Sequence, residues 1–253
     1  GVFFSIGSTI ATSLVPKEKE ASAIAIMFTG LTVALVTGVP LGTWIGQHFG
    51  WRTTFLVVSA LGLIALIGSA MLVPRNLKKS VPARISEQVQ VLLKPRLVLV
   101  YLMTILGYGG TFTAFTFLAP MLQQETGFAA SSISLIMLVY GVSVALGNIY
   151  GGKLADRKGP VAALTLIFTA LALILFALTF TMQFKVAAVI TVLIWGAFAF
   201  GNVPGLQVYV VQLAEKHTPN AVDVASGLNI AAFNVGIALG SVIGGAVVEH
   251  MSL

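Results

Sequence analysis

The stretch GGKLADRKGP, residues 151 to 160, places Lys153, Asp156, Arg157 and Lys158 within six positions. Only 9% of the 253 residues are Asp, Glu, Lys or Arg, whereas soluble domains carry about 25%. A charge cluster in so apolar a chain needs a physical reason. Because long apolar runs lie on both sides of it, the cluster is expected in a tight connection between two helices.

Runs without Asp, Glu, Lys or Arg fill most of the chain. Each of the seven long runs has at least 22 residues, and a helix needs about 20 to cross the hydrocarbon core. A membrane β-barrel is excluded, because its strands have about 10 residues of alternating polarity. The sequence therefore predicts an all-α, polytopic helical membrane protein in a lipid bilayer. The predicted helices are 1–15 (partial), 22–47, 53–73, 97–122, 131–152, 160–182, 186–213 and 224–248.

Lysine and arginine alternate between rich and poor connections. One set of alternate connections holds 12 of them and the other set holds 2. The positive-inside rule places the rich set, which includes residues 151–160, in the cytoplasm. The net charge of +6 therefore has a topological explanation and does not indicate nucleic acid.

Few residues suggest chemistry within the membrane. The chain has no Cys and only three His, at 48, 217 and 250, all near predicted helix ends and far apart in sequence. No metal site or cofactor is therefore expected. An intramembrane enzyme is a weaker reading, because no G-x-S-x-G occurs and no His or acidic pair lies within a predicted span.

Residues 74–96 form the longest polar segment and hold six Lys or Arg and three Pro. We interpret the segment as a cytoplasmic linker that divides the chain into residues 1–73, with three helices, and residues 97–253, with five. Its middle, 85–93, is expected to form either a short amphipathic helix on the membrane surface or part of a flexible tether.

Polar and aromatic side chains within 97–122 and 186–213 suggest a cavity. An unpartnered amide in hydrocarbon costs several kcal/mol (roughly 2–7), so these groups are expected to face protein or water. The stretch Gly201-Asn202-Val203-Pro204-Gly205 predicts a helix break. Packing between helices is the alternative for each residue, and it is favoured for Asn148, Asn229 and Asn234. The candidates for lining a substrate cavity are Tyr108, Thr111, Phe115, Trp195, Asn202 and Gln207.

Two helices share a glycine pattern. Glycines recur every four residues at 38, 42 and 46 and again at 236, 240 and 244, and each helix opens with Ala-Ser. Glycine on one face lets two helices approach closely, so Gly38, Gly42, Gly240 and Gly244 are expected at close helix contacts. A parallel repeat of about 200 residues is typical of a transporter with two related halves.

These motifs together resemble the major facilitator superfamily of secondary transporters. GGKLADRKGP resembles the superfamily's cytoplasmic loop motif G-x-L-A-D-R-x-G-R, with Pro160 in place of the last arginine. TGVPLGTWIGQHFGWRTTF, residues 37–55, resembles the fifth helix of the drug and sugar efflux branch, which includes arabinose-type proton antiporters. Val39 separates Gly38 from Pro40, and Gly42 stands alone where the antiporter motif has two glycines. The motif residues are Gly38, Pro40, Gly42 and Gly46, with Gly240 and Gly244 as packing counterparts.

The resemblance implies a twelve-helix fold of two bundles, of which this chain would hold the fourth to eleventh helices. It also implies proton-coupled efflux of sugars or drug-like compounds by alternating access in a bacterial inner membrane, by a monomer without cofactors. Uptake of a metabolite, or a membrane protein without transport activity, is the alternative. All eight acids lie in connections or at helix ends, so the proton carrier is expected in the absent first helices.

The resemblance also explains the cluster at 151–160 as a conformational latch. Gly152 and Gly159 are expected to form its turn, and the carboxylate of Asp156 suits the positive N-terminus of the helix after Glu20. Arg157 is expected to hold Asp156 or to pair with Glu18 or Glu20. The alternative is a solvated loop that only sets topology, which we favour for Lys153 and Lys158.

Overall fold

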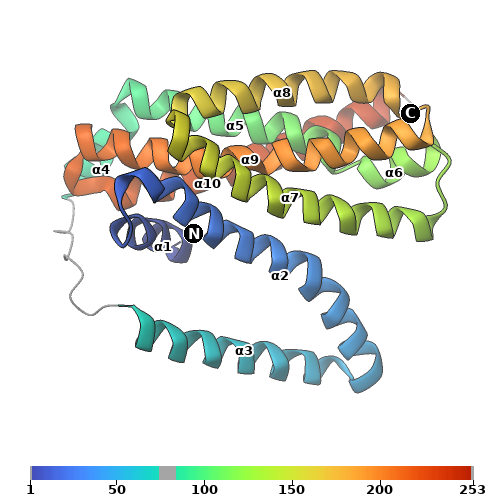
Figure 1. Ribbon diagram of the computed structural model, residues 1–253, viewed down its shortest axis with the longest axis horizontal. Helices are drawn as coiled ribbons and strands as arrows, with labels where there is room; N and C mark the ends of the chain where they lie inside the picture. Colours follow the sequence, from blue (N-terminus) through green and yellow to red (C-terminus); the bar gives the residue numbers. More distant parts are fainter. Residues whose placement is uncertain (1, 74–83, 252–253) are drawn as a thin grey trace.

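The computed structural model describes residues 2–73 and 84–251, which form helices and no strand (Figure 1). The prediction of an all-α protein is confirmed. The elements are α1 (Val2–Ser13), the 3-10 helix η1 (Lys17–Lys19), α2 (Glu20–Phe49), α3 (Trp51–Leu72), α4 (Ile85–Leu93), α5 (Pro95–Phe115), α6 (Leu118–Gln124), α7 (Ala130–Lys158), α8 (Pro160–Thr181), α9 (Lys185–His217), the 3-10 helix η2 (Pro219–Ala221) and α10 (Val222–Met251).

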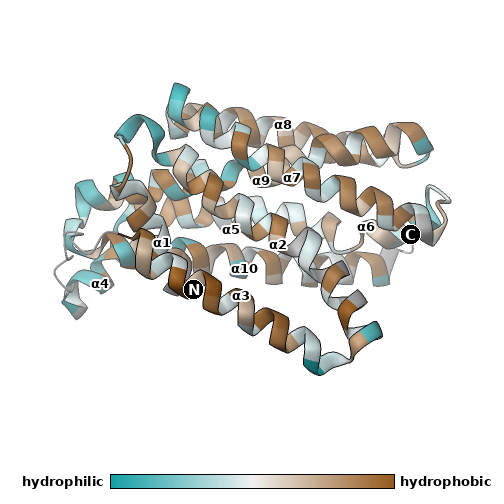
Figure 2. Ribbon diagram, turned by 60° about the horizontal axis from the view of Figure 1, so that its bottom comes forward, coloured by the Kyte–Doolittle hydropathy of each residue, from teal (hydrophilic) through white to brown (hydrophobic). Residues whose placement is uncertain are grey.

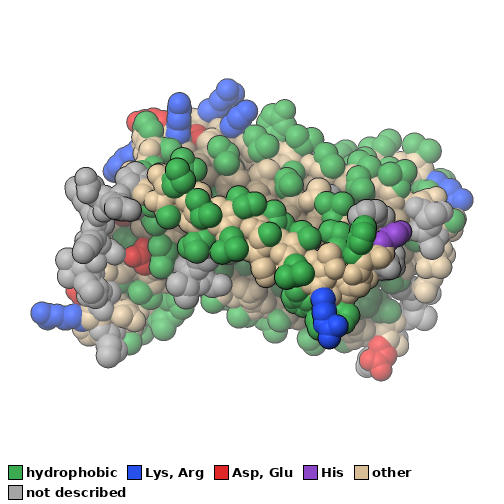
Figure 3. Space-filling model, turned by 90° about the horizontal axis from the view of Figure 1, so that it is seen from below, with side chains coloured by type: hydrophobic (Ala, Val, Ile, Leu, Met, Phe, Trp, Pro, Cys, Tyr) green, Lys and Arg blue, Asp and Glu red, His purple; other side chains and the backbone are tan. Residues whose placement is uncertain are grey.

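Within the described residues, six helical segments are long and apolar enough to cross a membrane: α3, α5 with α6, most of α7, α8, α9, and η2 with most of α10. The seventh predicted span corresponds to α2, which has 30 residues. Figure 2 shows hydrophobic residues along the helices and hydrophilic ones mainly near their ends. Figure 3 shows a face of the molecule with many hydrophobic and few charged side chains. The chain is a multi-pass membrane protein.

The opening cluster lies in a helix, which corrects the expectation of a loop. Helix α7 continues to Lys158, and Gly159 alone separates it from α8. The sequence LADRK consists mostly of good helix formers, and basic side chains stabilise a helix C-terminus. Gly159 has a φ of +80°, a left-handed conformation that glycine adopts without steric cost, so the turn requires only this glycine.

The predicted break in α9 is also wrong. The helix runs without interruption from Lys185 to His217 with Pro204 inside it. Proline removes one backbone donor, but residues 201–208 are all buried by neighbouring helices. A proline in a membrane helix is tolerated where neighbours and local adjustments satisfy the freed backbone group.

The most extensive helix contacts are between helices that follow residues 74–96, the segment that the sequence predicts to be a linker. Helix α5 lies along α10, α7 lies along α9, and α8 covers α9 (Figure 1). Helices α1 and α2 contact this group through α10, and through α7 and α9, respectively. Helix α3 contacts α2 and has no buried residue, so its apolar side chains suit contact with lipid.

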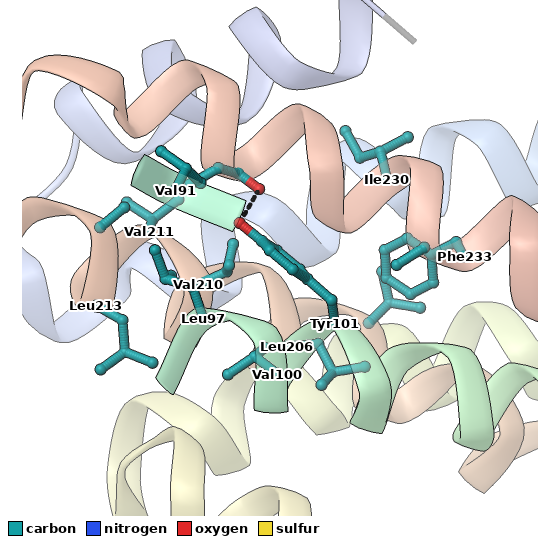
Figure 4. Close-up of a cluster of buried hydrophobic side chains, with 14 of the residues drawn as sticks. Val91, Leu97, Val100, Tyr101, Leu206, Val210, Val211, Leu213, Ile230 and Phe233 are labelled. Atoms are coloured by element: carbon teal, nitrogen blue, oxygen red, sulfur yellow. Dashed lines mark hydrogen bonds between the residues drawn. The ribbon is translucent and has the colours of Figure 1, made fainter. Parts of the chain in front are cut away.

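Helix α4 has the bounds predicted for a short amphipathic helix, Ile85–Leu93, so this part of the segment is a helix and not a flexible tether. It docks on α5, η2 and α10, with Val91 fully buried. Figure 4 shows Val91 in a cluster with Leu97, Val210 and Val211, beside a hydrogen bond of 3.4 Å from the Tyr101 hydroxyl to the Ala225 carbonyl. The rest of the predicted linker, 74–83, lies outside the described residues.

The glycines of α10 bring two helices together. A Cβ on Gly240 would overlap the carbonyl of Gly109, and one on Gly244 would lie 2.5 Å from the Thr113 carbonyl oxygen. These contacts join α10 to α5, so they lie within residues 97–253 and not between the two predicted halves.

The glycines of α2 differ from the expectation of close helix contacts. Gly38 meets nothing within 4 Å among the described residues, and the nearest neighbour of Gly42 and of Gly46 is Thr54 of the adjoining helix α3. The spacing of glycines alone did not distinguish these faces from that of α10, because a glycine permits a close approach without requiring one. The side chain of Pro40 lies outside the described residues.

Candidate functional site

The carboxylate of Asp156 binds the first turn of α2. Its Oδ1 accepts from the Ala21 backbone N–H at 2.9 Å, and its Oδ2 accepts from the Ser22 N–H at 3.0 Å and from the Ser22 hydroxyl. The side chain of Lys19, the residue before α2, makes no capping hydrogen bond to these groups. Asp156, which lies 135 positions from Ala21 in the sequence, therefore accepts from donors that a helix N-terminus leaves unpaired. The charge also suits the positive end of the helix dipole.

Gly152 explains how α7 and α2 come close enough for this contact. A Cβ at this position would lie 2.6 Å from Ala25 Cβ and 2.8 Å from the Ala21 carbonyl oxygen. The glycine thus serves helix packing, not the turn that the sequence suggested. Its spacing of four residues from Asp156 places both on one face of α7.

Two further contacts join α1 and α2 to the rest of the protein at the same end. Gln212 Nε2 donates to Glu20 Oε2 at 3.3 Å, and the Thr9 hydroxyl donates to Asp223 Oδ1 at 2.6 Å. Glu20 is buried and precedes the charge-free run of α2. Desolvation raises the pKa of its carboxyl, and Glu215 and Asp156 add to this, against the hydrogen bond from Gln212 and the charge of Lys17.

We call this end of the molecule the basic end, after Lys17, Lys19, Lys153, Lys158 and Lys216. Arg157 does not make the pairing expected of it, since no ion pair with Asp156, Glu18 or Glu20 occurs in the described residues. Its side chain is exposed and lines a hollow between α7, α8 and α9.

A cavity of about 270 Å³ lies deeper, between α1 and α2 on one side and α5, α7, α9 and α10 on the other. Asn148 lines it and lies eight residues before Asp156, about 12 Å along α7 at 1.5 Å per residue. Aromatic rings form much of the wall. Phe4 and Phe28 stack at 5.3 Å between centroids, and Tyr108 meets Phe233 edge to face at 4.5 Å.

The polar groups of this cavity are neutral. Asn148 Nδ2 donates to Thr32 Oγ1 across the cavity wall at 3.4 Å, and its Oδ1 is buried without a donor from the described residues. Asn234 lies on the wall and donates to the Ile230 carbonyl of its own helix. No Asp, Glu, Lys, Arg or His lines the cavity within the described residues. Such a wall suits an uncharged molecule with apolar and hydrogen-bonding parts.

Of the six residues expected to line a cavity, only Tyr108 lines this one. Thr111 is buried, and Phe115 and Trp195 pack with Tyr140 in a separate core cluster. Asn202 is fully buried and donates to the Ala199 carbonyl at 3.0 Å.

Gln207 belongs to a buried network and not to the cavity wall. It accepts from Asn229 Nδ2 at 2.9 Å and donates to the Ser226 hydroxyl, and Thr104 donates to Asn229 Oδ1 at 2.7 Å. This network joins α5, α9 and α10. The bridging role that the sequence favoured for Asn229 agrees with these bonds.

The sequence reasoning missed most of the cavity, including Thr32, Asn148 and the rings of Phe4, Phe28, Phe200 and Phe233. One signal was available. Asn148, Gly152 and Asp156 recur every four residues, so an amide lies on the helix face that the glycine and acid already mark. The described residues contain no group of three or more His, Cys, Asp or Glu that could hold a metal ion.

A family model and the curated relatives of this chain agree with one another. The family model described as Major Facilitator Superfamily matches residues 1–241. The chain is 55% identical over 253 residues to the protein named "Uncharacterized MFS-type transporter YtbD" of Bacillus subtilis (strain 168), covering 100% of this chain and 64% of that protein. It is 38% identical over 251 residues to "Inner membrane transport protein YdhP" of Escherichia coli (strain K12), covering 98% of this chain and 62% of that protein. The chain thus spans less than two thirds of the length of these relatives.

Proposed function

The chain belongs to the major facilitator superfamily, and from this premise we propose that the protein moves a small molecule across the membrane by alternating access. The observation that carries the proposal is the contact of Asp156 with the start of α2. It lies at one end of a cavity that is bounded by one group of helices, α1 and α2, and by a second group, α5, α7, α9 and α10. Contacts that close one end of a cavity and can separate are what alternating access requires.

We propose that the structure corresponds to the outward-facing state, with the basic end in the cytoplasm. The bonds of Asp156, Glu20 and Asp223 to the opposite group of helices all lie at that end. Helix α2 diverges from α7 toward the other end (Figure 1). In the inward-facing state the helix end that carries the proposed latch, Gly152, Asp156, Arg157 and Gly159, would separate from α2.

The substrate that suits the cavity is an uncharged, amphipathic molecule such as a sugar or a drug-like compound, moved outward. The aromatic wall and the amides of Asn148 and Asn234 support this class. The glycine and proline pattern of α2, Gly38 to Gly46, supports the efflux branch. Location in a bacterial inner membrane is supported by the name of the Escherichia coli relative.

Counterflow in proteoliposomes tests the proposal with the full-length protein and a panel of neutral sugars, neutral drug-like compounds and charged analogues. We expect saturable exchange of one neutral compound, and we expect Asn148→Ala to raise its KM by about tenfold, since a lost hydrogen bond to a buried amide costs about 1–2 kcal/mol. Gln123→Ala, which also removes an amide but at an exposed position of α6 away from the cavity, is the control. Exchange of charged compounds only would contradict the substrate class, and absence of any exchange would contradict transport.

A further inference from the structure

A second hollow, of about 650 Å³, opens between α7, α8 and α9. None of its lining residues belongs to α1, α2 or α10, so it is separate from the cavity described above. Helices α7 and α8 meet at Gly159 and diverge from there, with α9 behind them (Figure 1). Ala197, Phe198 and Gly201 line it from α9, and the exposed Leu146, Tyr150 and Leu166 line it from the other two helices.

Charge is confined to one end of this hollow. Lys153 and Arg157 lie one helical turn apart on α7, both exposed, at the basic end. The Lys153 ammonium lies 5.8 Å from the centroid of the Tyr150 ring. Among the described residues no acid lines the hollow, and the nearby carboxylate of Asp156 binds α2 instead. The lining thus has two cations at one end and is otherwise almost entirely apolar.

The length of the hollow matches one leaflet of a bilayer. From Leu146 to Arg157, α7 advances by eleven residues, about 16 Å at 1.5 Å per residue. The hydrocarbon core of a bilayer is about 30 Å thick, so one leaflet contributes about 15 Å. A ligand that fills the hollow therefore has an anionic head at the basic end and an apolar tail that reaches the bilayer midplane.

We propose that the hollow binds one anionic phospholipid from the leaflet at the basic end. Its phosphate lies between Lys153 and Arg157, and an acyl chain lies along Tyr150, Leu166 and Phe198. Basic pockets between transmembrane helices are recognised by anionic headgroups. The bound lipid joins α7 to α8 next to Gly159, beside the helix end that carries Asp156. Lipid composition therefore acts on the same helix end as the latch.

The test measures lipid retention by the full-length protein with native mass spectrometry, using phosphatidylglycerol, phosphatidylcholine and glycerol 3-phosphate as probes. We expect retention of phosphatidylglycerol in preference to phosphatidylcholine. Lys153→Gln should weaken it about fivefold, the effect of one cation near an anionic headgroup. Lys158→Gln removes the same charge from an exposed position of the same helix end that does not line the hollow, and should leave retention unchanged.

A third variant tests the acyl-chain part. Leu166→Trp at the exposed rim fills the hollow and should reduce retention of phosphatidylglycerol, while circular dichroism confirms the fold. Equal effects of Lys153→Gln and Lys158→Gln, or equal retention of both lipids, would overturn the site, because surface charge alone would then explain binding. Displacement of phosphatidylglycerol by glycerol 3-phosphate, or full retention by Leu166→Trp, would overturn the lipid as occupant.

Discussion

Asp156 shows what one residue does at the contact between the two groups of helices. It completes a helix N-terminus that belongs to a distant part of the chain, with two backbone N–H groups and one hydroxyl as donors. Hydrogen bonds to charged groups contribute about 1.5–3 kcal/mol each. The sequence could predict the pairing because an acid in a basic segment is not needed for topology and a helix N-terminus needs an acceptor.

Asp156→Asn tests whether this contact is a latch. Asparagine retains one acceptor oxygen but loses the charge, and a loss of about 1–2 kcal/mol shifts an equilibrium between two states roughly 5- to 30-fold. We expect counterflow by the full-length protein to fall several-fold with normal membrane insertion. Lys158→Gln, in the same helix end, should transport as the wild type does. Unchanged transport by Asp156→Asn would leave the cluster with a topological role only.

Glu20 makes the basic end sensitive to pH. Its folded-state pKa is raised above the ordinary value near 4.5 by burial. A raised carboxyl pKa means that the folded state binds the proton more tightly, so stability from Glu20 is greatest below pH 4.5 and is lost as pH rises through the folded pKa. Glu20→Gln removes this dependence. We expect the thermal unfolding midpoint of Glu20→Gln to equal or exceed that of wild type at pH 7.

The same pair of proteins supplies the control at lower pH. As pH falls toward 4.5, protonation makes wild-type Glu20 resemble the glutamine, so the two midpoints should converge. A midpoint for Glu20→Gln below that of wild type at pH 7 would show instead that the ionised form of Glu20 stabilises the fold.

At the scale of helices, the sequence predicted which segments are helical better than it predicted where each helix ends or breaks. The bounds of α4 agree because an amphipathic segment lies between polar stretches. The break in α9 did not occur, because burial of residues 201–208 by neighbouring helices outweighs the local tendency of Pro204 and two glycines. The end of α7 was placed too early, because membrane hydropathy marks where a helix leaves the hydrocarbon and not where it ends.

Gly240 carries a prediction about the α5–α10 contact. A methyl group there overlaps the Gly109 carbonyl, and overpacking of this kind costs about 1–3 kcal/mol. Gly240→Ala should therefore lower the thermal unfolding midpoint of the purified protein. The matched control is Gly110→Ala in α5, where nothing lies within 4 Å of the added Cβ and helix propensity favours alanine by about 0.5–1 kcal/mol. Equal midpoints for the two variants would mean that the helices separate at no cost.

At the scale of the whole molecule, composition predicts a division into two groups of helices, but it did not predict the cavity that lies between α1 and α2 on one side and α5, α7, α9 and α10 on the other. Its wall combines rings from α1, α2, α5, α9 and α10, and each ring alone has the composition of ordinary packing or lipid contact. Phe200 lines the cavity, whereas Phe115 packs against Trp195. Only the relative placement of the helices determines which of these roles a ring has. The sequence had no information on that placement beyond the spacing of Asn148, Gly152 and Asp156.

If transport is coupled to protons, as the resemblance to the efflux branch implies, the positions of the acids predict where the proton carrier lies. A proton carrier in an antiporter must be reached from both sides of the membrane and is expected near its middle. In the structure, Glu18 and Glu20 lie at the junction of η1 and α2, Glu87 lies in α4, and the others lie at or near the ends of helices. These others are Glu125, Asp156, Glu215, Asp223 and Glu249. Coupling through an acid of this chain is therefore not expected.

Neutralising the eight acids one at a time in the full-length protein tests this, with substrate-induced proton release as the measurement and substrate binding as the control. We expect all eight variants to retain proton release, with Asp156→Asn slower, because loss of the proposed latch would change the rate of the conformational change and not the number of protons. Loss of release with intact binding in any one variant would identify that acid as the carrier. Such a result would also mean that a helix end now at the surface enters the membrane during transport.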